Sequence, residues 1–137
     1  MSTFEINELR MYGVYDSGVA NLERIVIRVL EQVNLGDFGL MLGIRGHDGT
    51  GIPIRDNLLW FGHATVQPND WLFVYTGAGA TTVTQVPNTT EQIISLHWAR
   101  PATIFNGPEF LPILFRFDGV QLPPTPPSLP GPQSGGA

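Results

Sequence analysis

Residues 66–79, VQPNDWLFVYTGAG, decide the fold of this chain. The Pro-Asn-Asp sequence at 68–70 predicts a turn, and the aromatic and β-branched run at 71–76 predicts a strand. Its side chains alternate between two faces, with Trp71, Phe73 and Tyr75 on one and Leu72, Val74 and Thr76 on the other. Because neither face is polar, the strand is either central in a two-layer fold or has one face covered by a partner.

Most of the remaining chain reads as short strands separated by turn residues. The clearest strand is 23–30, where Arg24 and Arg28 share the face opposite to an apolar one. Residues predicted to point inward are Ile25, Ile27 and Val29, then Phe38, Leu40, Leu42 and Ile44, then Ile94, Leu96 and Trp98, and finally Phe115 and Phe117. Shorter strands are predicted at 58–61 and, at a sheet edge, at 81–85. Gly39 and Gly43 leave one face of their strand bare, so that an aromatic side chain such as Trp60 or Trp71 can approach.

These elements predict an all-β fold, an antiparallel β-sandwich of seven or eight strands, with a closed barrel as the alternative. The sandwich is expected to span residues 22–122. Residues 1–21 show no clean period and are predicted to form an extended N-terminal arm. Residues 123–137 form a Pro/Gly-rich C-terminal tail with six prolines in fifteen residues and no charge.

The composition indicates a single domain whose surface is partly covered by a binding partner. The chain has 137 residues and no cysteine, which excludes disulfides and thiolate metal sites. Only 14% of residues are charged, against about 25% in typical soluble domains. All seven basic residues are arginine, and arginine is enriched at protein interfaces. A compositional bias of the genome is the alternative explanation for arginine without lysine. A net charge of -5 without clustered cations argues against nucleic acid, and no apolar run predicts a leader or a membrane span, so synthesis in the cytoplasm is expected.

Several of these segments resemble the lamin-tail-type domain. The matching features are the strand at 23–30, the turn at 33–38 (VNLGDF), the approach to the next strand at 67–71 (QPNDW), Trp98, Asn106, and the ending at 114–122 with its Asp-Gly pair. Asn69 stands where that family usually has glycine, and the insertion at 101–112 is not typical of it. The resemblance implies an immunoglobulin-like sandwich and a binding or structural module without catalysis.

Two short motifs contain side chains that are common in catalytic or metal sites. Asp16, Ser17 and Gly18 resemble the motif of retroviral-type aspartic proteases, which would pair two copies of Asp16 in a homodimer, but a turn is the simpler interpretation. His47 and Asp48 lie in a glycine-rich loop and supply too few ligands for a metal site. No catalytic residue, metal site or cofactor is predicted.

Together these features favour a non-enzymatic structural protein that binds neighbouring protein subunits, most plausibly a multi-copy phage virion component such as a head-decoration or minor capsid protein. A homo-oligomer or a larger assembly is expected, with no nucleic-acid or membrane partner. The residues predicted to make the contacts are Trp71, Phe73, Tyr75, Arg24, Arg28, Pro124, Pro126 and Pro127. For the tail, a disordered end is the alternative to a docking arm. The alternative functions are a free adhesive or ligand-binding module that uses Trp60, Trp71 or the loop 45–53, and, remotely, the Asp16 protease.

Overall fold

The computed structural model describes residues 5–125 and shows an all-β fold. In chain order the elements are β1 (Leu9–Tyr15), β2 (Arg24–Val29), β3 (Val33–Asn34), the 3₁₀ helix η1 (Leu35–Asp37), β4 (Phe38–Arg45), β5 (Gly51–Trp60), β6 (Thr65–Val66), β7 (Trp71–Tyr75), β8 (Thr82–Gln85), β9 (Gln92–His97) and β10 (Phe110–Arg116). Eight of these strands contain four residues or more, which agrees with the predicted seven or eight.

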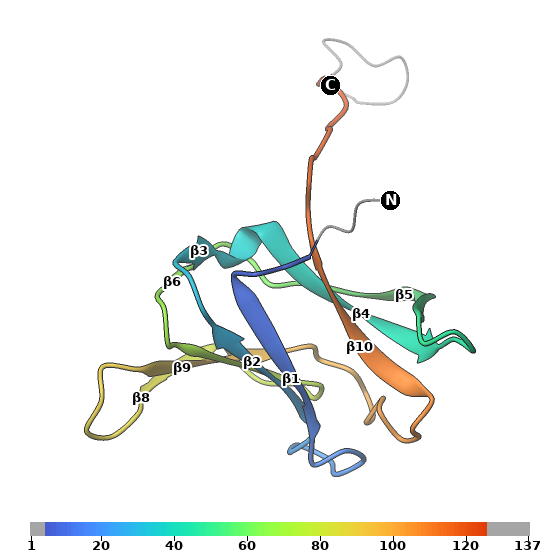
Figure 1. Ribbon diagram of the computed structural model, residues 1–137, viewed down its shortest axis with the longest axis horizontal. Helices are drawn as coiled ribbons and strands as arrows, with labels where there is room; N and C mark the ends of the chain where they lie inside the picture. The colour runs from blue at the N-terminus through green and yellow to red at the C-terminus, as the bar shows by residue number, and fades with distance from the viewer. Residues whose placement is uncertain (1–4, 126–137) are drawn as a thin grey trace, which may run out of the picture.

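The strands form a β-sandwich, as predicted. One sheet has the order β1-β2-β7-β9-β8, the other has the order β10-β4-β5, and β3 and β6 form a small separate pair (Figure 1). Apolar side chains from the two larger sheets meet between them, led by Ile25 and Leu72 from the first and Phe38 and Leu40 from the second. The immunoglobulin-like detail of the topology stays a prediction.

The predicted all-antiparallel pairing is wrong at one place, because β7 and β9 run parallel. The chain leaves β7, returns as the edge strand β8, and then enters β9 between the two. Because β8 runs antiparallel to β9, the chain reverses its direction twice between β7 and β9, and these two strands run the same way. A parallel pair of strands needs a long connection of this kind.

The predicted N-terminal arm is also wrong in part, because β1 is an edge strand of the five-stranded sheet. Leu9 is buried, and the strand pairs with β2 along its whole length, so the sandwich begins by residue 9 rather than at 22. The register shifts between Met11 and Gly13, where Tyr12 forms a bulge. A bulge inserts one extra residue and breaks the two-residue alternation, which is why the sequence shows no clean period here.

The predicted inward faces of β2 and β9 are confirmed, and of the two apolar faces of β7 the one with Leu72 and Val74 is buried. The buried residues are Ile25, Ile27, Val29, Leu72, Val74, Thr76, Ile94, Leu96 and Trp98. The prediction for Ile44 is wrong, since it is 40% exposed at the end of β4, where its register partner Ile52 is exposed as well.

The three-stranded sheet differs from the sequence prediction in its outer face. Phe115 is half-buried there and lies over Gly39, while Ile113 lies over Gly43, so Phe115 supplies the aromatic ring nearest to Gly39. Phe117 is also only partly buried, so Phe115 and Phe117 are not core residues. The strand itself starts earlier than predicted and includes a proline, which an edge strand tolerates because one of its sides has no hydrogen-bond ladder.

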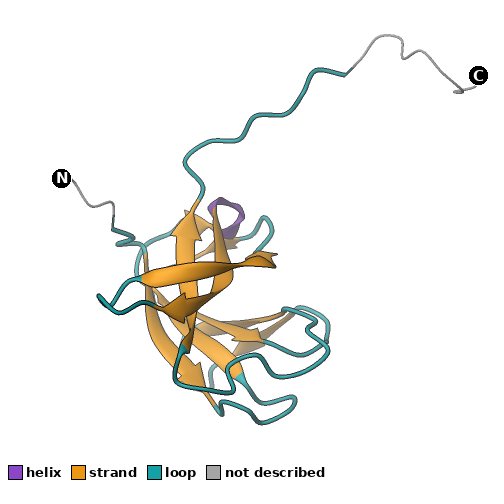
Figure 2. Ribbon diagram, turned by 90° about the vertical axis from the view of Figure 1, so that its right-hand side faces the viewer, coloured by secondary structure: helices purple, strands orange, loops and turns teal. Residues whose placement is uncertain are grey.

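The chain leaves the domain after β10. Figure 2 shows residues 118–125 running away from both sheets, and every residue in this segment is exposed, Pro124 included. Pro126 and Pro127 lie outside the described residues. At the base of the segment, the Arg116 guanidinium forms an ion pair with Glu8, with an N–O distance of 2.7 Å.

Candidate functional site

The five predicted contact residues of the domain lie on one surface, the outer face of the five-stranded sheet. Backbone pairing aligns this face in rows: Tyr15, Arg24, Tyr75 and His97; Gly13, Val26, Phe73 and Ser95; and Arg10, Arg28, Trp71 and Ile93. We call the set Tyr12, Tyr15, Arg24, Arg28, Trp71, Phe73 and Tyr75 the aromatic–arginine face. Strand β7 is therefore central in its sheet, with one apolar face in the core and the other directed outward.

Arg24 lies between aromatic rings of this face. Its guanidinium carbon is 5.8 Å from the ring centroid of Tyr15, 5.7 Å from that of Phe73 and 6.0 Å from that of Tyr75. The Nη1 group donates to Asp16 Oδ2 at 2.6 Å. The cation thus lies among three aromatic rings and is neutralised at the same time, and both interactions hold the side chain on the outer face of the sheet.

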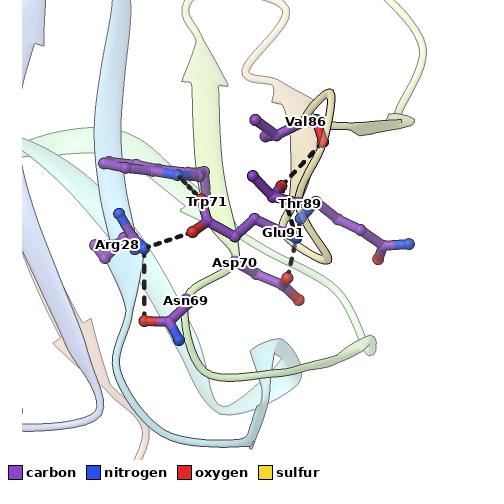
Figure 3. A network of polar contacts seen from close by, with 8 residues as sticks. Arg28, Asn69, Asp70, Trp71, Val86, Thr89 and Glu91 are labelled. Atoms are coloured by element: carbon purple, nitrogen blue, oxygen red, sulfur yellow. Dashed lines mark hydrogen bonds and ion pairs between the residues drawn. The ribbon is translucent and has the colours of Figure 1, made fainter.

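Arg28 makes the closest such contact, 4.2 Å from its guanidinium carbon to the ring centroid of Trp71. Its Nη2 group donates to Glu91 Oε2 at 3.4 Å and to Asn69 Oδ1 at 3.5 Å. Glu91 also accepts from Trp71 Nε1 at 3.2 Å, so one carboxylate holds both members of the stacked pair (Figure 3).

The turn before β7 positions this network. Asp70 is buried and accepts from the backbone N–H of Gln67 at 3.0 Å and from that of Gln92 at 3.1 Å. One carboxylate therefore closes the predicted Pro-Asn-Asp turn and fixes the start of β9 beside the start of β7. Asn69 has φ of 75° in that turn, a conformation that asparagine tolerates better than most residues.

A shallow groove of about 420 Å³ crosses the face. It is lined by Tyr12, Tyr15, Arg24, Val26, Trp71, Phe73, Val86 and Ile93. Tyr12 and Tyr15 are 49% and 45% exposed and form its rim, while the buried Val26 forms its floor beside Gly13, which has no side chain. Tyr12 packs edge-on against Trp71, with ring centroids 5.6 Å apart. The groove can therefore hold a narrow, mostly apolar chain by stacking.

Three members of the site were missed at the sequence level. Tyr12 and Tyr15 fall in the predicted arm, because the bulge in β1 interrupts the two-residue alternation that identifies a strand. The one available signal was their position on either side of a glycine in an otherwise apolar run. Glu91 lies 63 residues from Arg28, and a pairing at that separation has no local signature.

The other sequence motifs lie away from this face or have structural roles. Asp16 sits in a turn with φ of 53° and pairs with Arg24. Asp48 accepts from the Thr50 hydroxyl and the Thr50 backbone N–H, and these bonds lower the pKa of its carboxyl. Within residues 5–125, no group of three or more metal-ligating side chains is gathered, and no helix is long and apolar enough to cross a membrane.

The three tryptophans differ in their environments. Trp98 is a core residue at 7% exposure, Trp71 is half-buried beneath Arg28, and Trp60 is 47% exposed on the outer face of the three-stranded sheet. The Trp60 face is apolar as well, with Met41, Leu58, Ile113 and Phe115 aligned beside it by the pairing of β4 with β5 and β10.

Comparison of the chain with protein-family models, with curated proteins and with solved structures gives no match. The inference of function therefore rests on the geometry of the surface.

Proposed function

We propose that this protein is a non-enzymatic assembly protein that binds neighbouring protein subunits through the aromatic–arginine face. The observation that carries the proposal is the packing of the Arg24 and Arg28 guanidinium groups against aromatic rings across an outward-facing sheet surface. Arginine, tyrosine and tryptophan are the residues that most often dominate binding energy at protein interfaces. Rings held in fixed positions also lose little conformational entropy on binding.

The charges of the face favour a protein partner over a polyanion. Arg24 is paired with Asp16, and Arg28 with Glu91, so both cations are already compensated within the fold. A phosphate backbone is attracted by uncompensated, clustered cations. The net charge of -5 agrees with this preference.

The setting that we propose is a multi-copy virion component of a phage, a head-decoration or minor capsid protein, which would place the protein in the virion. Its support is the low fraction of charged residues, the absence of lysine from the sequence, and an exposed segment that leads into the Pro-rich tail. In a symmetric lattice, each copy can contact the next through the same surfaces, and weak contacts add up to firm attachment. The resemblance to lamin-tail-type domains implies a binding or structural role of the same kind.

A matched pair of double variants tests the proposed face. Tyr12→Ser/Tyr15→Ser alters the aromatic–arginine face, and Leu58→Ser/Trp60→Ser alters side chains of similar exposure on the opposite sheet. Native mass is measured by size exclusion with light scattering across a hundredfold concentration range. We expect the first variant to shift the oligomer toward monomer and the second to behave like the parent. The reverse pattern, or a parent that stays monomeric throughout, would overturn the proposal.

One observation favours a second candidate function, a free ligand-binding module. The volume of about 420 Å³ lies within the 300–1,000 Å³ usual for small-ligand sites, and the ring of Trp71 is part of the lining. Sugars are the ligand class to screen, because their apolar faces stack on aromatic rings. A saturable change in Trp71 fluorescence with a sugar, in a protein that remains monomeric, would favour this candidate over assembly.

A further inference from the structure

We propose that the groove of the aromatic–arginine face binds the Pro-rich segment 123–132, PPTPPSLPGP, of a second copy of this chain. The docking rests on the proposed function, because it names the partner of the same face. It also names the surface on which the tail docks, which the sequence alone does not indicate.

The groove has the chemistry that proline-rich segments require. Such segments favour the extended polyproline II conformation and dock in grooves lined by aromatic rings, with little entropy to lose. Here Tyr12, Tyr15, Trp71 and Phe73 line one groove, with Val26 as its floor. Proline rings can pack between these aromatic rings, as in other proline-binding grooves.

Hydrogen bonding and charge fit the same occupant. A proline-rich chain offers carbonyl acceptors and few N–H donors. The groove offers donors in the hydroxyls of Tyr12 and Tyr15 and in the Arg24 guanidinium. Because Arg24 and Arg28 are already paired with carboxylates, an uncharged segment suits the groove better than an acidic one, and residues 123–137 carry no charge.

The course of the chain directs the tail toward another molecule. Residues 118–125 run away from the domain (Figure 2). The apolar side chains of Val120 and Leu122 in this segment are 78% and 79% exposed. In the polyproline II conformation each residue adds about 3.1 Å, so a ten-residue segment of that conformation covers about 30 Å. That length is sufficient to reach a neighbouring copy of a small domain.

The other surfaces suit a proline-rich segment less well. On the three-stranded sheet, Phe115 and Ile113 fill the space above Gly39 and Gly43. A second groove, of about 610 Å³, lies along the edges of β1 and β10. An edge of this kind binds a partner through backbone hydrogen bonds, which proline cannot donate.

A peptide titration tests the docking. The receptor is the full chain carrying Trp60→Phe, so that Trp71 is the outward-facing tryptophan, together with Pro124→Ala, Pro126→Ala and Pro127→Ala to weaken its own tail. The ligands are the peptide PPTPPSLPGP and a control peptide in which alanine replaces the same three prolines. We expect a saturable change in Trp71 fluorescence with the first peptide, and at least tenfold weaker binding with the control peptide or with Tyr12→Ser in the receptor. No saturable change would overturn the docking.

The native mass of the variants separates this proposal from the proposed function. If Tyr12→Ser/Tyr15→Ser and the three tail substitutions in the parent chain each lower the mass, and the peptide titrates Trp71, docking between copies is supported. If only the face variant lowers the mass, the tail is not the occupant and the proposed function stands. If neither lowers it, both proposals fail. If the parent chain is a monomer and the peptide still changes the Trp71 fluorescence, the peptide displaces the tail of the same chain from the groove. That result would contradict docking between copies.

Discussion

The guanidinium of Arg28 lies 4.2 Å from the ring centroid of Trp71, and Glu91 accepts a hydrogen bond from each of these two side chains. The three residues come from β2, β7 and the turn that leads into β9, so the contact ties neighbouring strands together on the outer face. It also holds an indole ring in a fixed orientation beside the groove. A fixed ring of this kind is a suitable anchor for a binding partner.

Removal of the Arg28 guanidinium should loosen Trp71. In a Trp60→Phe background, Arg28→Ala should increase acrylamide quenching of the tryptophan fluorescence and lower the free energy of unfolding by about 0.5–1 kcal/mol, the value of a partly exposed cation–π contact. Arg28→Lys should fall between the parent and Arg28→Ala, because an ammonium stacks less well. Arg10→Ala, at the exposed register partner on β1, is the control. Quenching that is equal in Arg28→Ala and Arg10→Ala would contradict the stacked geometry.

The buried Glu23 should be essential for stability. Its carboxylate accepts from the backbone N–H groups of Gly18, Ile104 and Phe105 and from the Thr76 hydroxyl. Glu23→Ala would leave several of these donors without a partner, and the expected loss is about 2–4 kcal/mol in urea unfolding.

The exposed Glu31 provides the control for Glu23. Glu31→Ala should change the free energy of unfolding by less than about 0.5 kcal/mol. Glu23→Gln should be milder than Glu23→Ala, because one acceptor oxygen remains. Equal stabilities for Glu23→Ala and Glu31→Ala would refute the role of Glu23 in tying these segments together.

Gly39 should not tolerate a side chain. A Cβ atom at this position would lie 2.6 Å from the backbone oxygen of Leu59 and 2.8 Å from Phe115 Cζ. The backbone cannot move aside cheaply, so Gly39→Ala should lower stability by about 1–3 kcal/mol. Gly119→Ala, where no atom lies within 4 Å, is the matched control and should be nearly neutral. An unaffected thermal midpoint in Gly39→Ala would show that the outer face is packed differently.

The Glu8 and Arg116 pair should make stability depend on pH in the acid range. Partial burial acts to raise the pKa of Glu8, but hydrogen bonds from the backbone N–H groups of Asn7 and Glu8 and the Arg116 guanidinium outweigh it, so the pKa lies below its ordinary value of 4.5. A carboxyl with a lowered pKa in the folded state stabilises the fold above its unfolded pKa. This stabilisation is lost as the pH falls through the folded-state value.

Urea midpoints at pH 7 and pH 3 test this linkage. Glu8→Gln should reduce the loss of stability on acidification, and Arg116→Gln should reduce it in the same direction. The double variant should lose little beyond either single one, because the two residues act as a pair. Fully additive losses at pH 7 would contradict a direct interaction.

The sequence predicts the fold well where strands keep strict alternation. Strands β2 and β9 have uninterrupted periods of two, so the positions of Ile25 and Ile94 in the core were predictable, whereas β7 is apolar on both faces and its sequence does not say which face is buried. The same alternation predicted that Arg24 and Arg28 share a face of β2 and that Trp71, Phe73 and Tyr75 share a face of β7, and the pairing of the two strands places all five on one surface. Their role in binding stays a prediction.

Other features depend on contacts between distant segments and have no local signature. The β1 bulge at Tyr12 shifts the period, so an edge strand reads as an arm. The parallel pairing of β7 with β9 follows from the excursion through β8, which no single segment encodes. Glu91 joins Arg28 and Trp71 because two turns converge, and that convergence is a property of the complete fold.

The most direct test of assembly is the native mass of the full chain and of a chain that ends at Leu122, measured by size exclusion with light scattering at equal concentrations. We predict that the full chain forms an oligomer and that the shortened chain is a folded monomer, because the proposed docking between copies requires the segment that is removed. Clean monomers from both chains across the whole concentration range would contradict assembly through the aromatic–arginine face and the tail.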